Sequence, residues 1–559
     1  MKPLWCPILL CVLVGSSSVQ ADETTPEHQA GDNSLEIDKP ARAQPASPAI
    51  DSQKSRNDLP GDKPLEIDKP GRAQPATPVV DAEASPDAST SGSRRTEGDF
   101  SLANTALHGT QDRWNRPNPL FSPSVGQINM TRGDWSGWPF DSSGASGDWL
   151  GARDSLQDNG IYVEGVYTSF MEYNFEGGSD TGFFGGGLGS ASVTIDTEKL
   201  FAHPDGIFFI NYQTWSWYNH AFDNTGSFDP TSNYTGSNGN FPDAASVNQI
   251  SQLYYSQHLF DDLLNVAFGK QDANNIFSNI PGSGGFLYSG AGYTSTLNPF
   301  FTTFPQEATA LTMIVNVTDD LVGSFGWFDG SYGGLNATRN SIGQPIYTPA
   351  PRPGGRGPAT FFDNQGHWFL ISEWAMNWQL GETQLPGAVS AGGWLQTGRS
   401  LTGGTLEDGP GVEDVPGAYL SLNQTLWAPN STFASQGGGL IAFGQFGWSD
   451  PKKNPVQWSL MGGLSATGVI PGRPMDAMGL MGMWTAFSDN PGTWQSTTPA
   501  GGPGPAGGAE SAIEAFYRVQ LTPWLSMQPG VQFLGTPSGG DPAQLNDALV
   551  GYVMVELIF

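Results

Sequence analysis

The sequence predicts an all-β transmembrane protein, a closed antiparallel up-and-down β-barrel of about 16 strands with long outer loops and a short N-terminal helix. Three observations predict this fold class. Charged residues are scarce, apolar and polar residues alternate with a period of two in many short stretches, and tight turns alternate with long connections between those stretches. Such alternation gives each strand one apolar and one polar face, as required where a strand separates lipid from water.

The composition excludes an ordinary soluble globule and a helical membrane protein. Only 14% of the 559 residues are charged, against ~25% in typical soluble domains. Beyond residue 20, no run of roughly 18 apolar residues could cross a bilayer as a helix. Residues 1–113 contain 11 Lys or Arg and 17 Asp or Glu, which leaves 13 basic and 37 acidic residues for 114–559. So acidic a surface repels nucleic acid, and we expect no nucleic-acid partner.

The first 21 residues have the pattern of a cleaved signal peptide. Lys2 precedes the apolar run ILLCVLVG, and small residues precede a cleavage point after Ala21. Lipid attachment at Cys11 is the alternative, although Leu10 stands where such a site needs a small residue. Cys6 and Cys11 are the only cysteines, so we expect a mature chain without disulfides or thiol chemistry.

Residues 22–113 are predicted to form a disordered extension rich in Pro, Ala and Asp. Within it, LEIDKPARAQPASPAID at 35–51 and LEIDKPGRAQPATPVVD at 65–81 are identical at 13 of 17 positions, at an offset of 30 residues. The repeat is either a proline-stiffened spacer or a duplicated motif that docks a cell-wall or other partner.

Residues 114–160 are predicted to be a pre-barrel segment that contains one short helix. The stretch SGDWLGARDSLQDNG ends this segment. Asp148 suits the N-cap of the helix, and Gly160 suits its end, because glycine adopts the left-handed conformation that often follows a helix.

The barrel domain is predicted to span residues 161–559. In IYVEGVYTSFMEYNF the odd positions are uncharged, whereas Glu164 and Glu172 occupy even positions. A Lys or Arg on the lipid face costs about 2–4 kcal/mol at mid-bilayer, so the uncharged face should point outward. Pro529 lacks a ladder donor and predicts a bulge or a displaced strand. The predicted strands are 161–175, 190–201, 207–218, 250–259, 264–271, 308–318, 322–329, 368–378, 388–397, 419–427, 439–448, 457–466, 478–487, 511–521, 525–534 and 548–559.

The connections between these strands are of two kinds. AHPDG, FDDL, DDL and TPW are tight turns, and long stretches lie between them at 219–249, 272–307, 330–367 and 488–510. Membrane barrels sort their connections in this way, with short turns on the periplasmic side and long loops outside. Sixteen strands enclose an aqueous channel, so the default function is diffusion of small solutes.

The long connection 272–307 is predicted to fold into the lumen and narrow it, rather than to pack on neighbouring outer loops. Its glycines allow flexibility, and its aromatic rings offer flat apolar surfaces. A sugar channel needs such rings against the apolar faces of a sugar and planar polar groups for its hydroxyls. The candidate constriction residues are Phe286, Tyr288, Tyr293, Phe300 and Phe301.

Polar residues on the inward-facing strand positions are the other candidate sugar contacts. Many such residues only face water or pair with one another. The candidates are Glu164, Asn211, Gln213, Trp215, Trp217, Glu373, Glu514, Arg518 and Gln520. The sequence points to no catalytic residue, no cofactor and no metal site.

Four stretches resemble the OprB-type carbohydrate-selective porin family, over about residue 147 to the C-terminus. They are GDWLGARDSLQDNGI (147–161), FGKQDANNIF (268–277), PGRPMDAMGLM (471–481) and AIEAFYRVQLTPWLSMQPGVQFL (512–534). The resemblance implies a sixteen-stranded outer-membrane barrel that passes glucose and other sugars. It marks as family-like the positions Glu514, Tyr517, Arg518, Trp524, Gln528, Arg473 and Asp476. Leu150 departs from the family, which usually has glycine there.

Three other functions stay open. An acidic pore that prefers cations would make a general porin. A barrel enzyme would need a nucleophile motif or helical metal-ligand spacing, and neither accompanies the six histidines. Residues 22–113 could anchor the barrel to a partner. We expect sugars and outer-membrane lipid as partners, with a homo-oligomer possible.

The final stretch GYVMVELIF is predicted to pair with 161–175 and close the barrel, with Glu556 facing water inside. Its aromatic Phe559 resembles the signal through which the barrel-assembly machinery receives outer-membrane barrels.

Overall fold

A computed structural model describes the barrel and the segment just before it. The described residues are 144–178, 181–217, 247–288, 291–304, 307–330, 337–339, 345–347, 357–362, 367–400, 412–435, 437–454, 456–489, 507–537 and 546–559. The predicted signal peptide, the extension 22–113 and most of the pre-barrel segment lie outside these residues.

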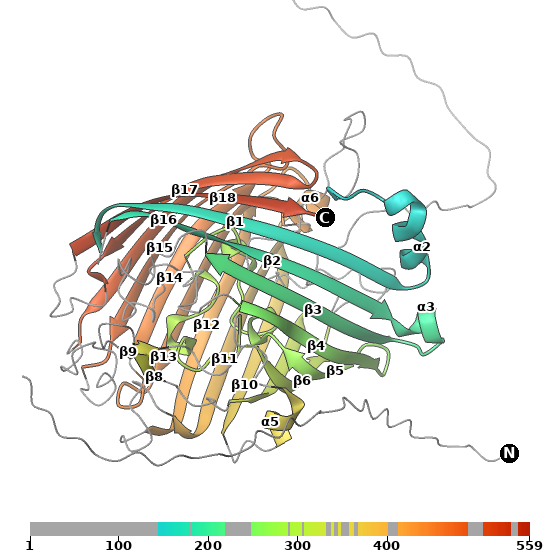
Figure 1. The fold of residues 1–559 in the computed structure, drawn as a ribbon, viewed down its shortest axis with the longest axis horizontal. Coiled ribbons are helices and arrows are strands. Elements are labelled where there is room, and N and C mark those ends of the chain that lie inside the picture. The colour runs from blue at the N-terminus through green and yellow to red at the C-terminus, as the bar shows by residue number, and fades with distance from the viewer. Residues whose placement is uncertain are drawn as a thin grey trace, which may run out of the picture. The chain divides into compact units, whose positions relative to one another are not determined.

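Sixteen strands form a closed antiparallel barrel within the described residues, which confirms the predicted fold class (Figure 1). Each strand pairs with its neighbours in sequence, β7 pairs with β10, and β1 pairs with β18 to close the ring. The strands are β1 (Ile161–Gly178), β2 (Gly182–Asp196), β3 (Gly206–Trp217), β4 (Val247–Leu259), β5 (Leu264–Gln271), β6 (Ala308–Asn316), β7 (Leu321–Asp329), β10 (Trp368–Leu380), β11 (Leu385–Ser400), β12 (Val412–Trp427), β13 (Gly439–Ser449), β14 (Val456–Thr467), β15 (Ala477–Phe487), β16 (Ala509–Thr522), β17 (Leu525–Gly535) and β18 (Asn546–Ile558).

The other elements are short. β8 (Ala337–Arg339) and β9 (Pro345–Tyr347) form a separate two-stranded sheet. The helical turns are η1 (Trp149–Gly151), α2 (Ala152–Asp158), α3 (Thr197–Phe201), η3 (Ala273–Asn275), η4 (Pro281–Ser283), η6 (Ser295–Leu297), α5 (Pro358–Phe362) and α6 (Ser431–Ser435). None of the helices in the described part of the chain is long and apolar enough to cross a membrane.

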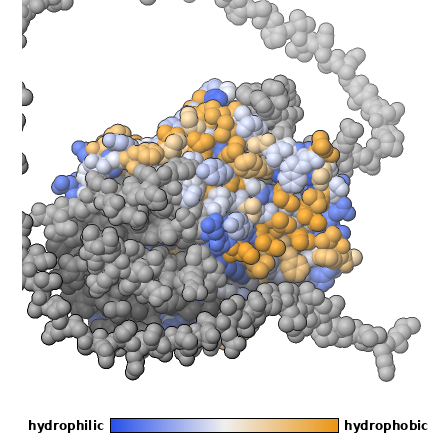
Figure 2. Space-filling model, in the orientation of Figure 1, coloured by the Kyte–Doolittle hydropathy of each residue, from blue (hydrophilic) through white to orange (hydrophobic). Residues whose placement is uncertain are grey.

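The two faces of each strand differ as the period-two pattern predicts. Along β1, Phe170 and Glu172 are buried inside the barrel, whereas Met171 and Tyr173 are exposed on its outside. Figure 2 shows patches of apolar surface (orange) over the described part of this outer face. Exposed apolar residues are stable there because lipid, not water, surrounds them. Others on this face are Tyr212, Leu370, Leu420, Leu460 and Ile513.

Short and long connections alternate around much of the barrel, although only residues 179–181 and 450–455 join β1 to β2 and β13 to β14. Residues 260–263, 381–384 and 523–524 join strand pairs at one end, and 272–307 and 330–367 join pairs at the other. Because neighbouring strands run in opposite directions, these three short connections share one end of the barrel. In Figure 1 this end carries α2, α3 and the C-terminus.

The predicted strand 190–201 is wrong at its C-terminal end, because a helix replaces its last five residues. Asp196 ends β2, and its Oδ1 accepts hydrogen bonds from the backbone nitrogens of Glu198 (2.9 Å) and Lys199 (3.2 Å). This is an N-cap, and it starts α3 at Thr197. Alternation of apolar residues did not reveal it.

The predicted N-terminal helix is present. Asp148 precedes its first turn, η1, and Oδ1 of Asp148 accepts a hydrogen bond from the backbone nitrogen of Asp154 in α2 at 3.4 Å. The N-cap residue of α2 itself is Gly151. Leu150 is left-handed (φ 62°) and fully exposed. Gly160 follows the helix with φ 83°, as predicted, and a Cβ there would lie 2.6 Å from Cβ of Lys199. Glycine is therefore required at the joint between helix and barrel.

The bulge or displacement predicted at Pro529 is wrong. β17 runs through Pro529, which pairs with Val553 of β18. Toward β16 the pairing passes from Phe516–Gly530 to Val519–Met527 with no change of register. A strand can therefore carry a proline where the ladder on one side has a gap.

Candidate pore constriction

The described residues of the connection between β5 and β6, which we call the inner loop (residues 272–307), lie inside the barrel. These residues form hydrogen bonds with inward-facing side chains of six consecutive strands, β12 to β17, and of β10. Those side chains are Glu373, Tyr419, Asn423, Gln445, Ser459, Thr485, Glu514 and Gln528.

The first anchor of the inner loop is at Ser278. Its backbone nitrogen donates to Oε2 of Glu373 (2.9 Å) and lies 3.2 Å from Oη of Tyr419. Tyr419 also donates to Oε2 of Glu373 (2.5 Å). Nε2 of Gln445 donates to the Ser278 carbonyl oxygen at 3.1 Å. Three strands thus hold one residue of the loop.

The second anchor is Glu514 of β16. Its carboxylate accepts hydrogen bonds from the backbone nitrogens of Leu287 (2.7 Å) and Tyr288 (2.8 Å). Oη of Tyr552 (2.6 Å) and Nε2 of Gln532 (3.1 Å) donate to the same carboxylate. Glu514 is fully buried, so these four donors replace water around its charge.

A third anchor joins the loop to β14 and the connection before it. Oγ1 of Thr294 and Oγ of Ser459 are 2.8 Å apart, and Nδ2 of Asn454 donates to the carbonyl oxygen of Thr296 at 2.8 Å. The loop is therefore bonded along most of its length, not only at its two ends.

Apolar contacts fill the space between the loop and the wall. Phe286 packs against Phe516 (ring centroids 4.9 Å apart) and Phe443 (5.6 Å). Phe300 packs against Trp394 (5.7 Å). Close packing of these buried rings adds to the anchoring hydrogen bonds.

The five candidate aromatic residues divide into two groups. Phe286, Tyr288, Phe300 and Phe301 are buried, with at most 9% of each exposed. Tyr293 is only partly buried, and its ring centroid lies 5.0 Å from that of Phe301. The buried rings pack between loop and wall, so Tyr293 alone of the five retains a face that a solute could reach.

The wall candidates lie on several strands. Nδ2 of Asn211 donates to Oγ of Ser190 (2.8 Å), and Oγ of Ser251 donates to Asn211 (2.5 Å). Glu164 and Gln213 are half-buried. Trp215 and Trp217 belong to β3, but their side chains lie outside the described set. Whether any of these residues contacts sugar stays a prediction.

Two further wall candidates lie on β16. Arg518 is 2% exposed and interacts electrostatically with Glu556. Nε2 of Gln520 donates to the carbonyl oxygen of Thr522 at 2.8 Å. Both face the interior at the end of the barrel that carries the short turns.

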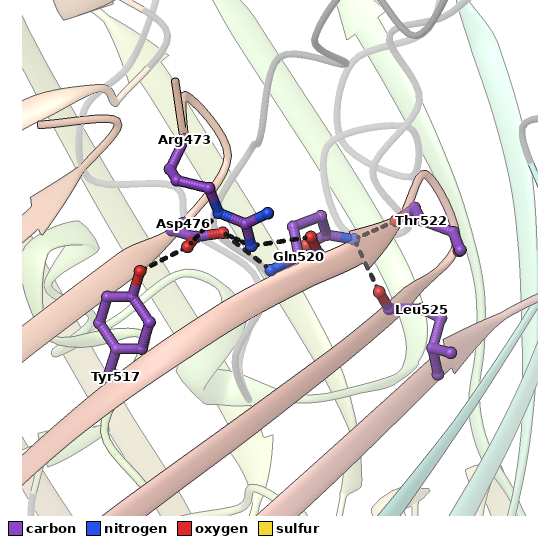
Figure 3. A network of polar contacts seen from close by, with 6 residues as sticks. All are labelled: Arg473, Asp476, Tyr517, Gln520, Thr522 and Leu525. Atoms are coloured by element: carbon purple, nitrogen blue, oxygen red, sulfur yellow. Dashed lines mark hydrogen bonds and ion pairs between the residues drawn. The ribbon is translucent and has the colours of Figure 1, made fainter. Parts of the chain in front are cut away.

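Arg473 and Asp476 form a clamp at that same end (Figure 3). Nε and Nη2 of Arg473 each lie 2.7 Å from an oxygen of Asp476. Asp476 also accepts from Oη of Tyr517 (2.5 Å) and the backbone nitrogen of Gln520 (3.0 Å). The clamp ties the turn between β14 and β15 to β16, which is a structural role.

Sequence reasoning missed the tyrosines and amides that hold the loop. Tyr419, Asn423 and Gln445 occupy inward positions, so the period-two pattern could have placed them on the correct face. No group of three or more His, Cys, Asp or Glu side chains in the described ranges is arranged to hold a metal ion.

The comparisons with known proteins agree with this geometry. A family model described as carbohydrate-selective porin, OprB family, matches residues 191–557. Porin B of Pseudomonas aeruginosa is 22% identical over 439 residues, which cover 74% of this chain and 90% of that protein. The high-pH structure of Pseudomonas putida OprB superposes with a TM-score of 0.60 at 20% identity, over 76% of this chain and all of that one. The chain belongs to the OprB family of carbohydrate-selective porins and is a sugar-selective barrel channel of the outer membrane.

Proposed function

We propose that small sugars diffuse passively along the accessible side of the inner loop, with the ring of Tyr293 as the stacking surface. The observation that carries this proposal is the division of the aromatic residues: four are buried, and Tyr293 is partly exposed. A sugar presents an apolar face that stacks on an aromatic ring, and this contact requires an accessible ring face.

Amide groups stand near this ring. Nδ2 of Asn274 donates to the carbonyl oxygen of Gly292 at 3.1 Å, which holds residues 274–275 beside 292–293. Nδ2 of Asn275 donates to Oε1 of Gln252 on β4 at 3.2 Å. A side-chain amide can both donate and accept hydrogen bonds, so Asn275 and Gln252 suit the hydroxyl groups of a sugar.

Planar-bilayer conductance with sugar titration tests the proposal. We expect sugars to block the ion current through the wild-type channel, and Tyr293→Ala to weaken the block while leaving the open channel. Tyr212→Ala is the matched control, because this tyrosine is exposed on the outer face of β3. Equal sugar block in the wild type and Tyr293→Ala would refute the role of Tyr293.

A general cation-preferring porin is the second candidate. It is supported by the charge of the barrel part of the chain, since residues 114–559 contain 13 basic and 37 acidic residues. An acidic pore attracts cations. A reversal potential measured in a salt gradient, together with equal permeation of sugars and other small solutes, would favour this candidate.

The fold and the family are those of a channel rather than of an enzyme. For residues 22–113, we propose a spacer that does not contribute to transport. Deletion of these residues should leave conductance unchanged, and loss of conductance on deletion would reject the spacer. Release of a bound cell-wall component on deletion would favour the docking alternative.

A further inference from the structure

We propose that Glu514, with Glu373 as its counterpart on the facing wall, is a positioning residue that fixes the inner loop and thereby sets the constriction, without touching solute. The inference rests on the proposed function only in assuming that solute passes beside the loop. It changes the role of two residues that the sequence offered as sugar contacts.

The hydrogen-bond capacity of Glu514 is fully used by the protein. Oε1 accepts from the backbone nitrogen of Leu287 and from Oη of Tyr552, and Oε2 accepts from the backbone nitrogen of Tyr288 and from Nε2 of Gln532. A carboxylate has about four lone-pair sites, and four donors occupy them. A sugar hydroxyl could bind only by displacing one of these partners.

Two consecutive backbone N–H groups converge on this one carboxylate. Leu287 and Tyr288 are 227 and 226 residues away from Glu514 in sequence, so the contact fixes a distant segment and not a local turn. Charge-assisted hydrogen bonds to backbone N–H groups are shorter and stronger than neutral ones. Oη of Tyr288 also donates to Oε1 of Glu510 at 2.8 Å, which extends the attachment along β16.

Glu373 holds the loop at a second point on another part of the wall. It bonds the backbone nitrogen of Ser278, nine residues before Leu287. Five strands, β11 to β15, separate β10 from β16 in the barrel order. Two carboxylates on well-separated strands therefore hold one stretch of loop between them, which prevents it from swinging as a gate.

Glutamine is the informative substitution at position 514, since it keeps the shape of the side chain. In Glu514→Gln one acceptor oxygen becomes an NH2 donor, which faces donors already present in the site. At least two of the four hydrogen bonds are then lost, and the loop segment around residues 285–288 should detach. Glu164→Gln is the matched control: it removes one carboxylate from an inward-facing position of β1, and Glu164 takes part in none of the anchors described above.

Loop mobility can be measured directly with a nitroxide spin label on Gly284→Cys. Gly284 is partly exposed, and its φ of −63° suits a residue with a side chain. The chain has only two other cysteines, both among its first 21 residues. We expect an immobilised spectrum in the otherwise wild-type channel and in Glu164→Gln. We expect a mobile component in Glu514→Gln, with normal heat-modifiable migration and a flickering open-channel current.

An immobilised spectrum in a folded Glu514→Gln channel would overturn the proposal. If that variant does not assemble, Glu373→Gln tests the anchoring of the loop at its other carboxylate. A mobile component is again expected, and an immobilised spectrum in the folded Glu373→Gln channel would overturn the proposal. Sugar block measured on Tyr293→Ala is independent of these spectra. A mobile loop in Glu514→Gln, together with unchanged sugar block in Tyr293→Ala, would retain the positioning role and reject only the sugar contact.

Discussion

Nη2 of Arg153 donates to the backbone oxygen of Phe559 at 2.8 Å, and the two residues are 406 positions apart. The same nitrogen donates to the carbonyl oxygen of Val163 on β1 at 3.1 Å. The backbone nitrogen of Phe559 donates to the carbonyl oxygen of Gly165 at 2.8 Å. One guanidinium of α2 thus joins the end of β18 to the beginning of β1, where the barrel closes.

Replacing Arg153 should loosen this seam. Arg153 is 8% exposed, and a hydrogen bond from a charged group contributes about 1.5–3 kcal/mol. We expect Arg153→Met to lower the temperature at which the barrel unfolds in a heat-modifiability gel. Arg153→Lys should recover only part of this loss, because lysine keeps the charge but cannot reproduce the planar fork of the guanidinium. Lys199→Met, which removes an exposed cation, is the control. An unchanged transition in Arg153→Met would contradict the role of the seam contact.

Phe559 should matter for assembly as well as for closure. Phe559 is 39% exposed, and its backbone continues the ladder to Gly165. A charge at this lipid-facing position is costly, and we propose that the aromatic ring is read by the assembly machinery. Phe559→Asp should lower the yield of heat-modifiable barrel in the outer membrane, while Phe559→Tyr should keep it. Wild-type yield of the Asp variant would reject the proposal.

Leu150 occupies a conformation that favours glycine. A left-handed residue with a Cβ costs roughly 1–2 kcal/mol, and the exposed Leu150 side chain loses no packing when removed. Part of the gain is offset by the greater freedom of glycine in the unfolded chain. Leu150→Gly should therefore raise the unfolding temperature slightly, whereas Gly160→Leu should lower it. A lower transition in Leu150→Gly would show that the strain has been misassigned.

The clamp at Asp476 should weaken in acid. Burial alone would raise the pKa of Asp476, but hydrogen bonds from Arg473, from Tyr517 and from the backbone of Gln520 lower this pKa below its ordinary value of 3.8. The resulting stabilisation is complete above pH 3.8 and is lost as the pH falls through the lower, folded-state pKa.

The measurement is the unfolding temperature of the wild type and of Asp476→Asn from neutral pH to below pH 3.8. We expect the wild type to be more stable at neutral pH and the two curves to converge in acid. Asp158→Asn, at an exposed position of α2, should follow the wild type. Parallel curves for wild type and Asp476→Asn at all pH values would contradict the clamp.

The strands and their faces could be predicted because the bilayer imposes a rule on every residue that faces it. The lipid-facing Tyr173 position must be uncharged, and Glu172 must point inward, whatever the rest of the chain contains. Local chemistry outside this rule was harder to predict. Asp196 caps α3 at a point where the strand periodicity continues in the sequence. Pro529 fits inside β17 because only the pairing of β17 with β16 has a gap at this residue.

The candidate site was less predictable for a different physical reason. The pattern assigns Glu373 and Glu514 to the inner face, but it does not indicate which donors will meet them there. Those donors are backbone N–H groups of the inner loop, and every residue except proline carries one. Burial also distinguishes Tyr293 from the other four aromatic rings. The burial of each ring depends on the path of the inner loop, and the residue types alone do not determine that path.

The long separation between the inner loop and its anchors has a consequence for the order of assembly. Leu287 and Gly285 bond to residues 227 and 243 positions later in the chain. These contacts cannot form until β16 and β17 are in place, whereas the contacts with β10, β12 and β13 involve earlier strands. The full attachment of the inner loop therefore needs the same late strands that close the barrel.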